Sequence, residues 1–260
     1  MARETSTGAG KEGNPIMKFL SKHVLKPIDS ALDGLLRAVE QAGLTRQVQY
    51  PYYLSQDMFW WNVSKLFFNY EIFGSENIPP EGEAAVVCVN HQSLFDPLLY
   101  GVAITHHSRR ILHIMAKIEL FKMPIINSYI RWIYAFPVHR GEHDVEAYNQ
   151  ALEFLAEGEL VGMYPEGTLN GGGYNFLEPK TGAARLAIEA GVPIIPVGLT
   201  GPDQILPKGA KLPNFNVKLT AQIGEPIMLH EQYFGKEASH EEMADVMHHV
   251  MNRIKDLLLY

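Results

Sequence analysis

The sequence predicts an α/β protein with a mixed central sheet flanked by helices, preceded by an N-terminal helical element that associates with a membrane. The chain has 260 residues, of which 47% are apolar, so one large domain can bury a full core. From about residue 70 onward, short apolar runs alternate with segments of helical periodicity. Helical segments come before this alternation, so we place the α/β domain at residues 69–260.

The N-terminal part divides into a tail and two helical segments. Residues 1–15 are polar and rich in Gly, Thr and Glu, so we expect them to be disordered. Residues 16–40 carry apolar side chains at helical spacing, and Pro27 should kink or split that helix. Residues 56–68 form an aromatic helix that suits either a membrane interface or the core, and we assign 16–68 to a membrane-interface element. The face of the aromatic helix consists of Phe59, Trp60, Val63, Leu66 and Phe67.

Periodicity and length locate the strands and helices of the α/β domain. Candidate strands cover residues 68–73, 84–89, 111–116, 133–138, 160–164, 193–199 and 216–223. Candidate helices cover residues 97–104, 119–130, 145–157, 181–190 and 239–258.

Cap signals mark the ends of three of these helices. Asp144 is a candidate N-cap for the third helix, and Gly158 is expected to end it. Gly191 is expected to end the fourth helix. Ser239 with Glu242 forms a capping box ahead of the last helix.

The charge distribution bears on the kinds of partner. A net charge of −7 argues against a nucleic-acid partner. Residues 102–140, however, carry six Lys or Arg against one acid, Glu119. These cations form either a solvated face or a docking surface for an anionic group, such as a phosphate headgroup, coenzyme A or an acidic carrier protein. They are Arg109, Arg110, Lys117, Lys122, Arg131 and Arg140.

The sequence also limits how the protein can be located relative to a membrane. No run approaches the ~20 apolar residues that a spanning helix needs, and residues 1–15 do not resemble a signal peptide. We therefore expect a protein that is soluble or peripheral to a membrane, and we assign it to a peripheral position on the cytoplasmic side. The one cysteine, Cys88, excludes an internal disulfide, and its place in an apolar strand predicts a buried, inert thiol.

The most informative pair of residues is His91 and Asp96, which an apolar strand at 84–89 delivers to a turn that opens a helix. Either Ser93 caps this helix with Asp96 in its first turn, or Asp96 caps it with Pro97 at the first helical position. Both arrangements put the carboxylate at the positive end of a helix, which favours its ionised form. Asp96 can then hold one ring nitrogen of His91 while the other takes a proton, which predicts a general base.

The same His-x4-Asp spacing occurs twice more, and context argues against both pairs. His240 and Asp245 fall inside the predicted last helix, where five residues turn the side chains about 140° apart. His139 and Asp144 flank a stretch that also matches a His-x-x-Glu-His zinc-peptidase pattern. That chemistry requires a helix, whereas a preceding proline and an interrupting glycine favour a loop near a site, so no metal is expected.

Three further blocks follow His91 and Asp96 in order. Residues 136–141 end a strand with an arginine, and residues 163–168 end another with a carboxylate and a glycine. Residues 192–197 are an apolar strand with two prolines. Ligands bind at the strand ends of open α/β sheets, so we expect these blocks to surround one site.

Together with Asn90-His91-x4-Asp96, these blocks resemble the four ordered motifs of the glycerophospholipid acyltransferase family, typified by lysophosphatidic acid acyltransferases. The resemblance covers roughly residues 70–225. It implies transfer of a fatty acyl group from an acyl thioester, acyl-CoA or acyl-carrier protein, to the hydroxyl of a lysophospholipid such as 1-acylglycerol-3-phosphate, in phospholipid synthesis or remodelling. It also implies contact with a bilayer surface, and no cofactor is expected.

The resemblance and the chemistry together nominate the site residues. His91 is the candidate catalytic base and Asp96 its partner, because an alcohol attacks a thioester slowly unless a base removes its proton. Backbone N–H groups near Gly167, or at the helix start after His91, are candidates for stabilising the oxyanion. The candidate substrate-binding residues are Asn90, Arg140, Glu166, Gly167, Thr168 and Lys180.

One position departs from the family pattern. The third block of the family usually continues with an arginine tied to the acceptor phosphate, and here that position is Leu169. Arg140 or Lys180 would have to replace the lost cation. Either a neighbouring cation substitutes and nothing changes, or the acceptor is a lysophospholipid with a larger headgroup or another alcohol.

Two other functions fit parts of the sequence. The first is a hydrolase of the same architecture that releases fatty acid from acyl thioesters, although no serine stands in the Gly-x-Ser-x-Gly pattern of esterases. The second is a non-catalytic lipid-binding protein that uses the basic stretch and the aromatic helix.

Overall fold

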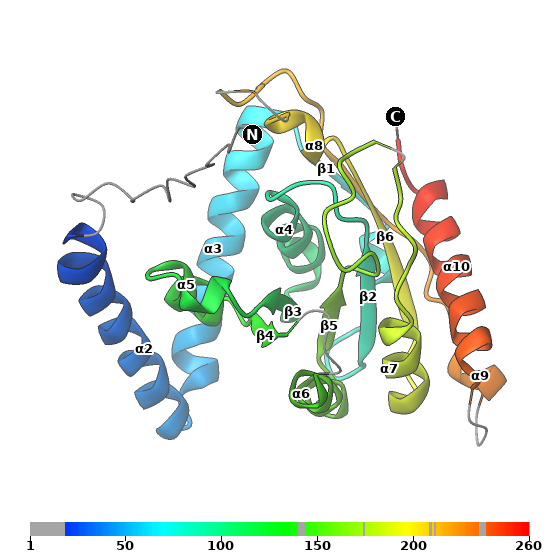
Figure 1. Cartoon of the computed structure of the whole chain (residues 1–260), viewed down its shortest axis with the longest axis horizontal. Helices are drawn as coiled ribbons and strands as arrows, with labels where there is room; N and C mark the ends of the chain where they lie inside the picture. The colour runs from blue at the N-terminus through cyan, green and yellow to red at the C-terminus, as the bar shows by residue number, and fades with distance from the viewer. Residues whose placement is uncertain are drawn as a thin grey trace, which may run out of the picture.

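The structure, a computed structural model, describes residues 19–139, 144–173, 175–207, 210, 212–233 and 238–259. Within these ranges the chain forms a seven-stranded sheet in the order β1-β7-β6-β2-β5-β3-β4 (Figure 1). Neighbouring strands are parallel except for β6 and β7, so the predicted mixed sheet is confirmed. The strands are β1 (Glu71–Phe73), β2 (Ala85–Val89), β3 (Leu112–Lys117), β4 (Phe136–Val138), β5 (Leu160–Met163), β6 (Ile194–Thr200) and β7 (Thr220–Ile223).

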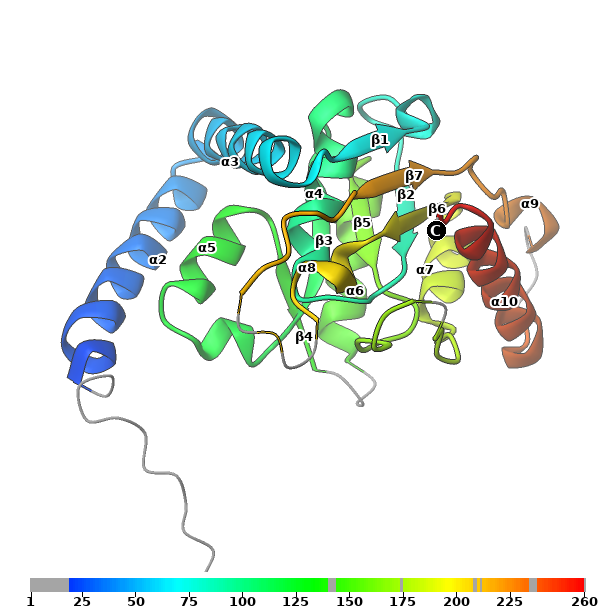
Figure 2. The same ribbon diagram turned by 90° about the horizontal axis from the view of Figure 1, so that it is seen from above.

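Helices cover both faces of the sheet. The α-helices are α2 (Lys26–Gln41), α3 (Thr45–Phe68), α4 (Asp96–Ser108), α5 (Ile126–Trp132), α6 (Val145–Ala156), α7 (Gly182–Ala190), α8 (Pro202–Ile205), α9 (His230–Tyr233) and α10 (His240–Asp256). A π-helix, η1 (Ser21–Leu25), precedes α2, and two 3-10 turns are η2 (Ser75–Asn77) and η3 (Leu120–Lys122). Seen from above, α3 and α4 lie on one side of the sheet and α7 and α10 on the other (Figure 2).

The central strand β2 shows why the sheet is covered on both faces. All five of its residues are completely buried. Val87 and Val89 pack in a cluster with α4, whereas Val86 and Cys88 pack in a second cluster with α6, α7 and α10. A parallel strand buried on both faces reads as a continuous apolar run, which is the pattern that predicted it. The buried position of Cys88 agrees with the prediction, and burial raises the pKa of its thiol well above the ordinary value.

Proline residues explain where the observed helices depart from the predicted ones. The expected split at Pro27 is wrong: η1 passes directly into α2, since Leu25 and Lys26 at the junction both have helical backbone angles and the proline is tolerated in the first turn of α2. The single helix predicted at 119–130 is wrong: η3 and α5 are separate, since Pro124 stands between them and Ile125 adopts φ 72°. The aromatic helix begins at Thr45 rather than at residue 56, with Pro51 accommodated inside it.

The predicted caps are found. The Asp144 carboxylate accepts a hydrogen bond of 3.0 Å from the N–H of Ala147 at the start of α6. Ser239 and Glu242 form the complete capping box of α10. Gly158 and Gly191 follow the ends of α6 and α7 with φ values of 80° and 67°, the left-handed conformation that ends a helix.

The N-terminal element is apolar on its outside. None of the described helices combines the length and hydropathy that crossing a membrane requires. In the aromatic helix, Trp60 and Trp61 pack against the core, as one of the two interpretations predicts, whereas Leu66 is 78% exposed. The apolar side chains exposed on η1 and α2 and just before them are Phe19, Leu20, Val24, Ile28, Leu32 and Leu35. Residues 1–15, predicted to be disordered, lie outside the described residues.

Buried His113 should make the stability of the fold depend on pH. Its ring, in β3, stacks on Phe154 of α6 at a centroid distance of 3.7 Å. Burial lowers its pKa from 6.5 to about 3, although a hydrogen bond with the Tyr134 backbone opposes the shift. Between these pH values the unfolded chain binds a proton that the folded protein does not, so stability falls as the pH falls, by up to about 1.4 kcal/mol per pH unit.

Denaturant unfolding between pH 6.5 and pH 4 measures this effect. As the pH falls, the free energy of unfolding of His113→Leu should decrease less steeply than that of the parent. The two slopes should differ by up to about 1.4 kcal/mol per pH unit, the value for one bound proton. His249→Leu, which removes an exposed histidine of α10, is the control and should keep the parental slope. Equal slopes for the parent and His113→Leu would contradict the prediction.

Candidate active site

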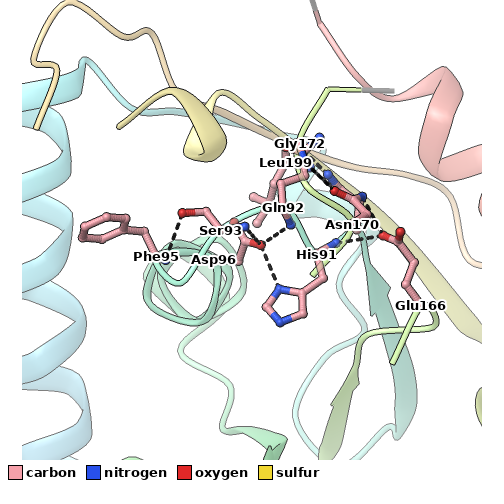
Figure 3. A network of polar contacts seen from close by, with 10 residues as sticks. His91, Gln92, Ser93, Phe95, Asp96, Glu166, Asn170, Gly172 and Leu199 are labelled. Atoms are coloured by element: carbon pink, nitrogen blue, oxygen red, sulfur yellow. Dashed lines mark hydrogen bonds and ion pairs between the residues drawn. The ribbon is translucent and has the colours of Figure 1, made fainter. Parts of the chain in front are cut away.

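The site lies where β2 and β5 end. These strands are adjacent and parallel, with Cys88 opposite Met163, so their carboxyl ends reach the same edge of the sheet. His91 follows β2 by two residues, and Tyr164 directly follows β5. The two predicted blocks that contain them are therefore brought together, as Figure 3 shows for His91, Asp96 and Glu166.

His91 and Asp96 form the predicted pair. Nδ1 of His91 lies 2.9 Å from Oδ2 of Asp96. The side chains are 8% and 0% exposed, so bulk water does not compete for this contact. With Nδ1 donating to the carboxylate, Nε2 carries the lone pair and can accept a proton.

Asp96 also shapes the turn before α4. Its Oδ2 atom accepts hydrogen bonds from the backbone N–H groups of Gln92, at 2.6 Å, and Ser93, at 2.8 Å. Asp96 is the first residue of α4, with Phe95 at the N-cap position and Pro97 in the first turn. Both predicted capping schemes are thus wrong in detail, although one of them correctly places Asp96 in the first turn.

Burial raises the pKa of the Asp96 carboxyl above its ordinary value. Hydrogen bonds from the His91 ring and from the backbone N–H groups of Ser93 and Gln92 oppose this shift, because they favour the ionised form. The carboxylate therefore depends on these donors to stay charged. A charged Asp96 in turn stabilises the imidazolium that forms when His91 takes a proton.

Glu166 stabilises the loop that carries His91 through hydrogen bonds. Its Oε1 atom accepts hydrogen bonds from the backbone N–H of His91 and from the Asn170 amide, each at 3.0 Å, and its Oε2 atom accepts one from the N–H of Leu177 at 2.9 Å. The N–H of Asn170 donates to the carbonyl of His91 at 2.8 Å. Both oxygens of this buried carboxylate are thus occupied within the protein, a geometry that fits positioning better than the substrate binding predicted for Glu166.

Asn90 has a comparable role. Its side chain is completely buried and donates to the carbonyl of Leu199 at 2.9 Å while accepting from the N–H of the same residue at 2.8 Å. Asn90 thereby links the end of β2 to β6, the strand that overlaps the last predicted block. This geometry differs from the predicted contact of Asn90 with substrate and supports a positioning role.

The remaining predicted residues lie around the turn after β5. Gly167 has φ 70°, and a Cβ added to it would lie 3.7 Å from Cγ of Lys180. The N–H of Lys180 donates to the carbonyl of Pro165 at 2.8 Å, and the Lys180 side chain is exposed. Thr168 and Leu169 are exposed at the same turn. Arg140 lies outside the described residues.

Three N–H groups at the two predicted sources of oxyanion donors already donate hydrogen bonds within the protein. The N–H of Gly167 donates to the carbonyl of Tyr164 at 2.9 Å. At the start of α4, the N–H groups of Gln92 and Ser93 point to the Asp96 carboxylate. The N–H groups of Gly167, Gln92 and Ser93 are therefore not available to a substrate oxygen in this arrangement.

The second His-x4-Asp pair repeats the contact in a different setting. Nδ1 of His139 lies 3.0 Å from Oδ2 of Asp144, but the His139 side chain is 52% exposed. Solvent screens such a pair and competes for both partners. His240 and Asp245 both lie within α10, as predicted. The stretch of the zinc-peptidase pattern between His139 and Asp144 lies outside the described residues.

Two cations of the predicted basic stretch, Arg110 and Lys117, lie at opposite ends of β3. Arg110 is buried and donates to the backbone carbonyls of Pro79, Glu83 and Gly158. Lys117 lies at the opposite, carboxyl end of β3 and is half-exposed beside Glu119. These two cations therefore do not share one surface.

Two cavities in the described part of the chain are lined by neither His91 nor Asp96. One of about 400 Å³ lies at the amino ends of β3 and β4, near Arg46, His113 and Glu159, and includes neither His91 nor Asp96. Another, beside Pro97 and Leu98 on α4, measures about 40 Å³, close to the volume of one water molecule. We therefore locate the site from its hydrogen-bond geometry.

Comparisons with known proteins identify the family of this chain. A family model described as acyltransferase matches residues 69–200. Over 190 residues the chain is 30% identical to the 1-acyl-sn-glycerol-3-phosphate acyltransferase of Bacillus subtilis strain 168, covering 72% of this chain and 87% of that protein. This chain belongs to the acyltransferase family.

Further relatives agree with the acyltransferase assignment. The chain is 30% identical over 148 residues to a chloroplast 1-acyl-sn-glycerol-3-phosphate acyltransferase of Brassica napus, covering 56% of this chain but 41% of that protein. The crystal structure of the 1-acyl-sn-glycerophosphate acyltransferase PlsC from Thermotoga maritima matches with a TM-score of 0.62 at 25% identity, covering 89% of this chain and 95% of that one.

Sequence reasoning missed two residues of the acyltransferase site. The Tyr164 ring stacks on the His91 ring at a centroid distance of 4.0 Å and an angle of 22°. Asn170 links Glu166 to the His91 loop and also accepts from the N–H of Gly172 at 2.9 Å. Tyr164 stood inside a recognised block, so an aromatic residue at a strand end was the available signal. Nothing local to Asn170 indicated its role.

Replacement of the Asp96 charge tests the pair. Asp96→Asn keeps an oxygen that can accept from the turn but removes the charge that stabilises the imidazolium. We expect kcat to fall roughly 10²- to 10⁴-fold with KM little changed, measured by steady-state acyl transfer. Asp245→Asn, in the third His-x4-Asp pair, should keep parental kinetics. A loss of less than tenfold for Asp96→Asn would argue against the dyad.

Proposed function

We propose that this acyltransferase moves a fatty acyl group from an acyl thioester, acyl-CoA or acyl-carrier protein, to the hydroxyl of a lysophospholipid such as 1-acylglycerol-3-phosphate. The observation that carries this proposal is the buried contact of 2.9 Å between His91 Nδ1 and Asp96 Oδ2, which leaves Nε2 to act as a base. The acceptor class is supported by the printed names of the Bacillus subtilis and Brassica napus relatives.

The reaction needs one proton to move twice. Nε2 of His91 takes the hydroxyl proton as the acceptor oxygen bonds to the thioester carbonyl carbon. The carbon–sulfur bond then breaks, and the imidazolium returns the proton to the departing thiolate. Asp96 stabilises the imidazolium in between and holds the ring in one orientation. Because the thiolate leaves readily, no covalent enzyme intermediate is required.

We place the enzyme at the surface of a membrane, on its cytoplasmic side. Support comes from the exposed apolar side chains of η1 and α2, among them Val24, Ile28 and Leu35. They recur three or four residues apart, so they share one face of the helix. Such a face lies in the headgroup region of a bilayer without crossing it.

Acceptor dependence separates transfer from hydrolysis. Thiol release from an acyl thioester should rise many-fold when a lysophospholipid is added, because the proposed nucleophile is its hydroxyl. His91→Ala should abolish release in both conditions. Equal release with and without acceptor would favour the thioester hydrolase, and retention of function by His91→Ala would favour a non-catalytic lipid-binding protein.

The identity of the acceptor depends on the turn that carries Leu169. This side chain is 39% exposed, and Lys180 is the described cation that lies beside the same turn at Gly167. Adding a guanidinium there should favour an acceptor with a terminal phosphate.

Leu169→Arg should therefore raise the ratio of kcat/KM for 1-acylglycerol-3-phosphate over that for a lysophospholipid with a larger headgroup, by about tenfold for one charged hydrogen bond. An acyl-transfer assay across a panel of acceptors measures this ratio. Leu44→Arg, which adds the same charge at an exposed position between α2 and α3, should leave it unchanged. An unchanged ratio in Leu169→Arg would show that this position does not select the acceptor.

A further inference from the structure

A second apolar surface lies at the edge of the sheet that carries His91. The chain that joins β6 to β7 exposes Leu212 at 79% and Phe215 at 54%. The C-terminal end of α3 exposes Leu66 at 78% and Phe67 at 46%. We call these four side chains the apolar rim. Soluble surfaces rarely gather large apolar side chains this exposed, so the rim calls for a partner.

Strand directions place the apolar rim at the active-site edge. β6 is parallel to β2 and β7 is antiparallel to β6, so the β6–β7 connection leaves and re-enters the sheet where β2 delivers His91. In Figure 1 this connection and α8 lie above the ends of the central strands, beside the C-terminal end of α3. Asp203 of α8 accepts a hydrogen bond of 3.2 Å from the N–H of Gly173, in the loop that Asn170 helps to fold.

The two parts of the apolar rim are packed together. The Phe215 ring lies 5.4 Å from the Phe67 ring and 5.7 Å from the Phe68 ring, centroid to centroid. Phe68 in turn packs against the core cluster that contains Leu219. The rim is therefore supported by the fold, and its outer side chains are presented in a defined place.

Lysine side chains near the apolar rim favour an anionic partner. From Gln204 to Gly224 the sequence has three lysines, of which Lys208 and Lys211 lie outside the described residues, and no acidic residue, although Asp203 and Glu225 border this range. Lys65 and Lys218 are exposed beside the rim, and Lys218 pairs with Glu71 at 2.8 Å. Apolar side chains with flanking lysines match an anionic bilayer, whose interior takes the former and whose headgroups attract the latter.

We propose that the apolar rim inserts into an anionic membrane surface, as a contact separate from the apolar face of α2. The inference rests on the proposed function, because a lysophospholipid acceptor resides in a bilayer. Contact at this edge lets the acceptor reach His91 without crossing water. It also sets the orientation of the active site, which a single contact through α2 leaves free to rotate.

A fluorescent label tests insertion directly. The one native cysteine, Cys88, is buried in β2, so Leu212→Cys can be labelled selectively with an environment-sensitive thiol probe. Vesicles containing phosphatidylglycerol should shift the emission to the blue and brighten it several-fold. Met228→Cys is the matched control: this side chain is 44% exposed and follows Ile227, which pairs with the amino end of β6.

The control label should not respond to the vesicles, and pure phosphatidylcholine vesicles should affect Leu212→Cys less. An unchanged Leu212→Cys signal overturns the proposal, whether or not the protein sediments with the vesicles. An equal response from Met228→Cys also overturns it.

Activity provides the second measurement. Leu212→Asp should lower kcat/KM at least several-fold for an acceptor presented in anionic vesicles, and should leave it unchanged for a short-chain acceptor that is monomeric in water. Met228→Asp should match the parent in both assays. Equal losses in both assays overturn the membrane role. Absence of transfer by the parent to any lysophospholipid would instead refute the proposed function, and the fluorescence result would still decide whether the rim inserts.

Discussion

One carboxylate oxygen, Oδ2 of Asp96, organises the active site. It accepts hydrogen bonds from the His91 ring and from two backbone amides of the turn before α4. The same atom therefore folds the turn, orients the imidazole and determines which ring nitrogen carries the proton. Because the side chain is completely buried, these donors and the helix N-terminus replace the water around Oδ2, whereas Oδ1 is buried and has no hydrogen-bond partner among the described residues.

The rest of the site keeps that turn in place. Glu166 holds the N–H of His91 from the end of β5, and Asn90 holds β6 from the end of β2. Parallel strands deliver all these residues to one edge, so short loops suffice to connect them. A base anchored at its backbone and its ring keeps its geometry when substrates come and go.

Local signals in the sequence predicted most of the fold and part of the site. Each predicted strand overlaps an observed one, because buried strands read as apolar runs, and the caps at Asp144 and Ser239 were visible for the same local reason. The helix at 119–130 was predicted whole because its apolar spacing concealed the effect of Pro124.

The contacts that complete the site are not local. Tyr164 reaches His91, and Asn170 reaches Glu166, only after two loops have met. The resemblance carried Asn90 and Glu166 over as substrate ligands, since a motif records that a residue matters and not which atoms it touches. The spacing of His139 and Asp144 matches that of His91 and Asp96, and the burial of the latter pair is what the spacing could not show.

The two hydrogen bonds between Asn90 and Leu199 affect how mutational data on this site are interpreted. A substitution of Asn90 would remove the side-chain link between the ends of β2 and β6, next to His91, and would leave the backbone ladder of the two strands in place. Loss of turnover in such a variant would look like loss of a catalytic group. An activity screen alone therefore does not distinguish such positioning residues from catalytic ones. A structural probe of the strand ends is needed to tell the two apart.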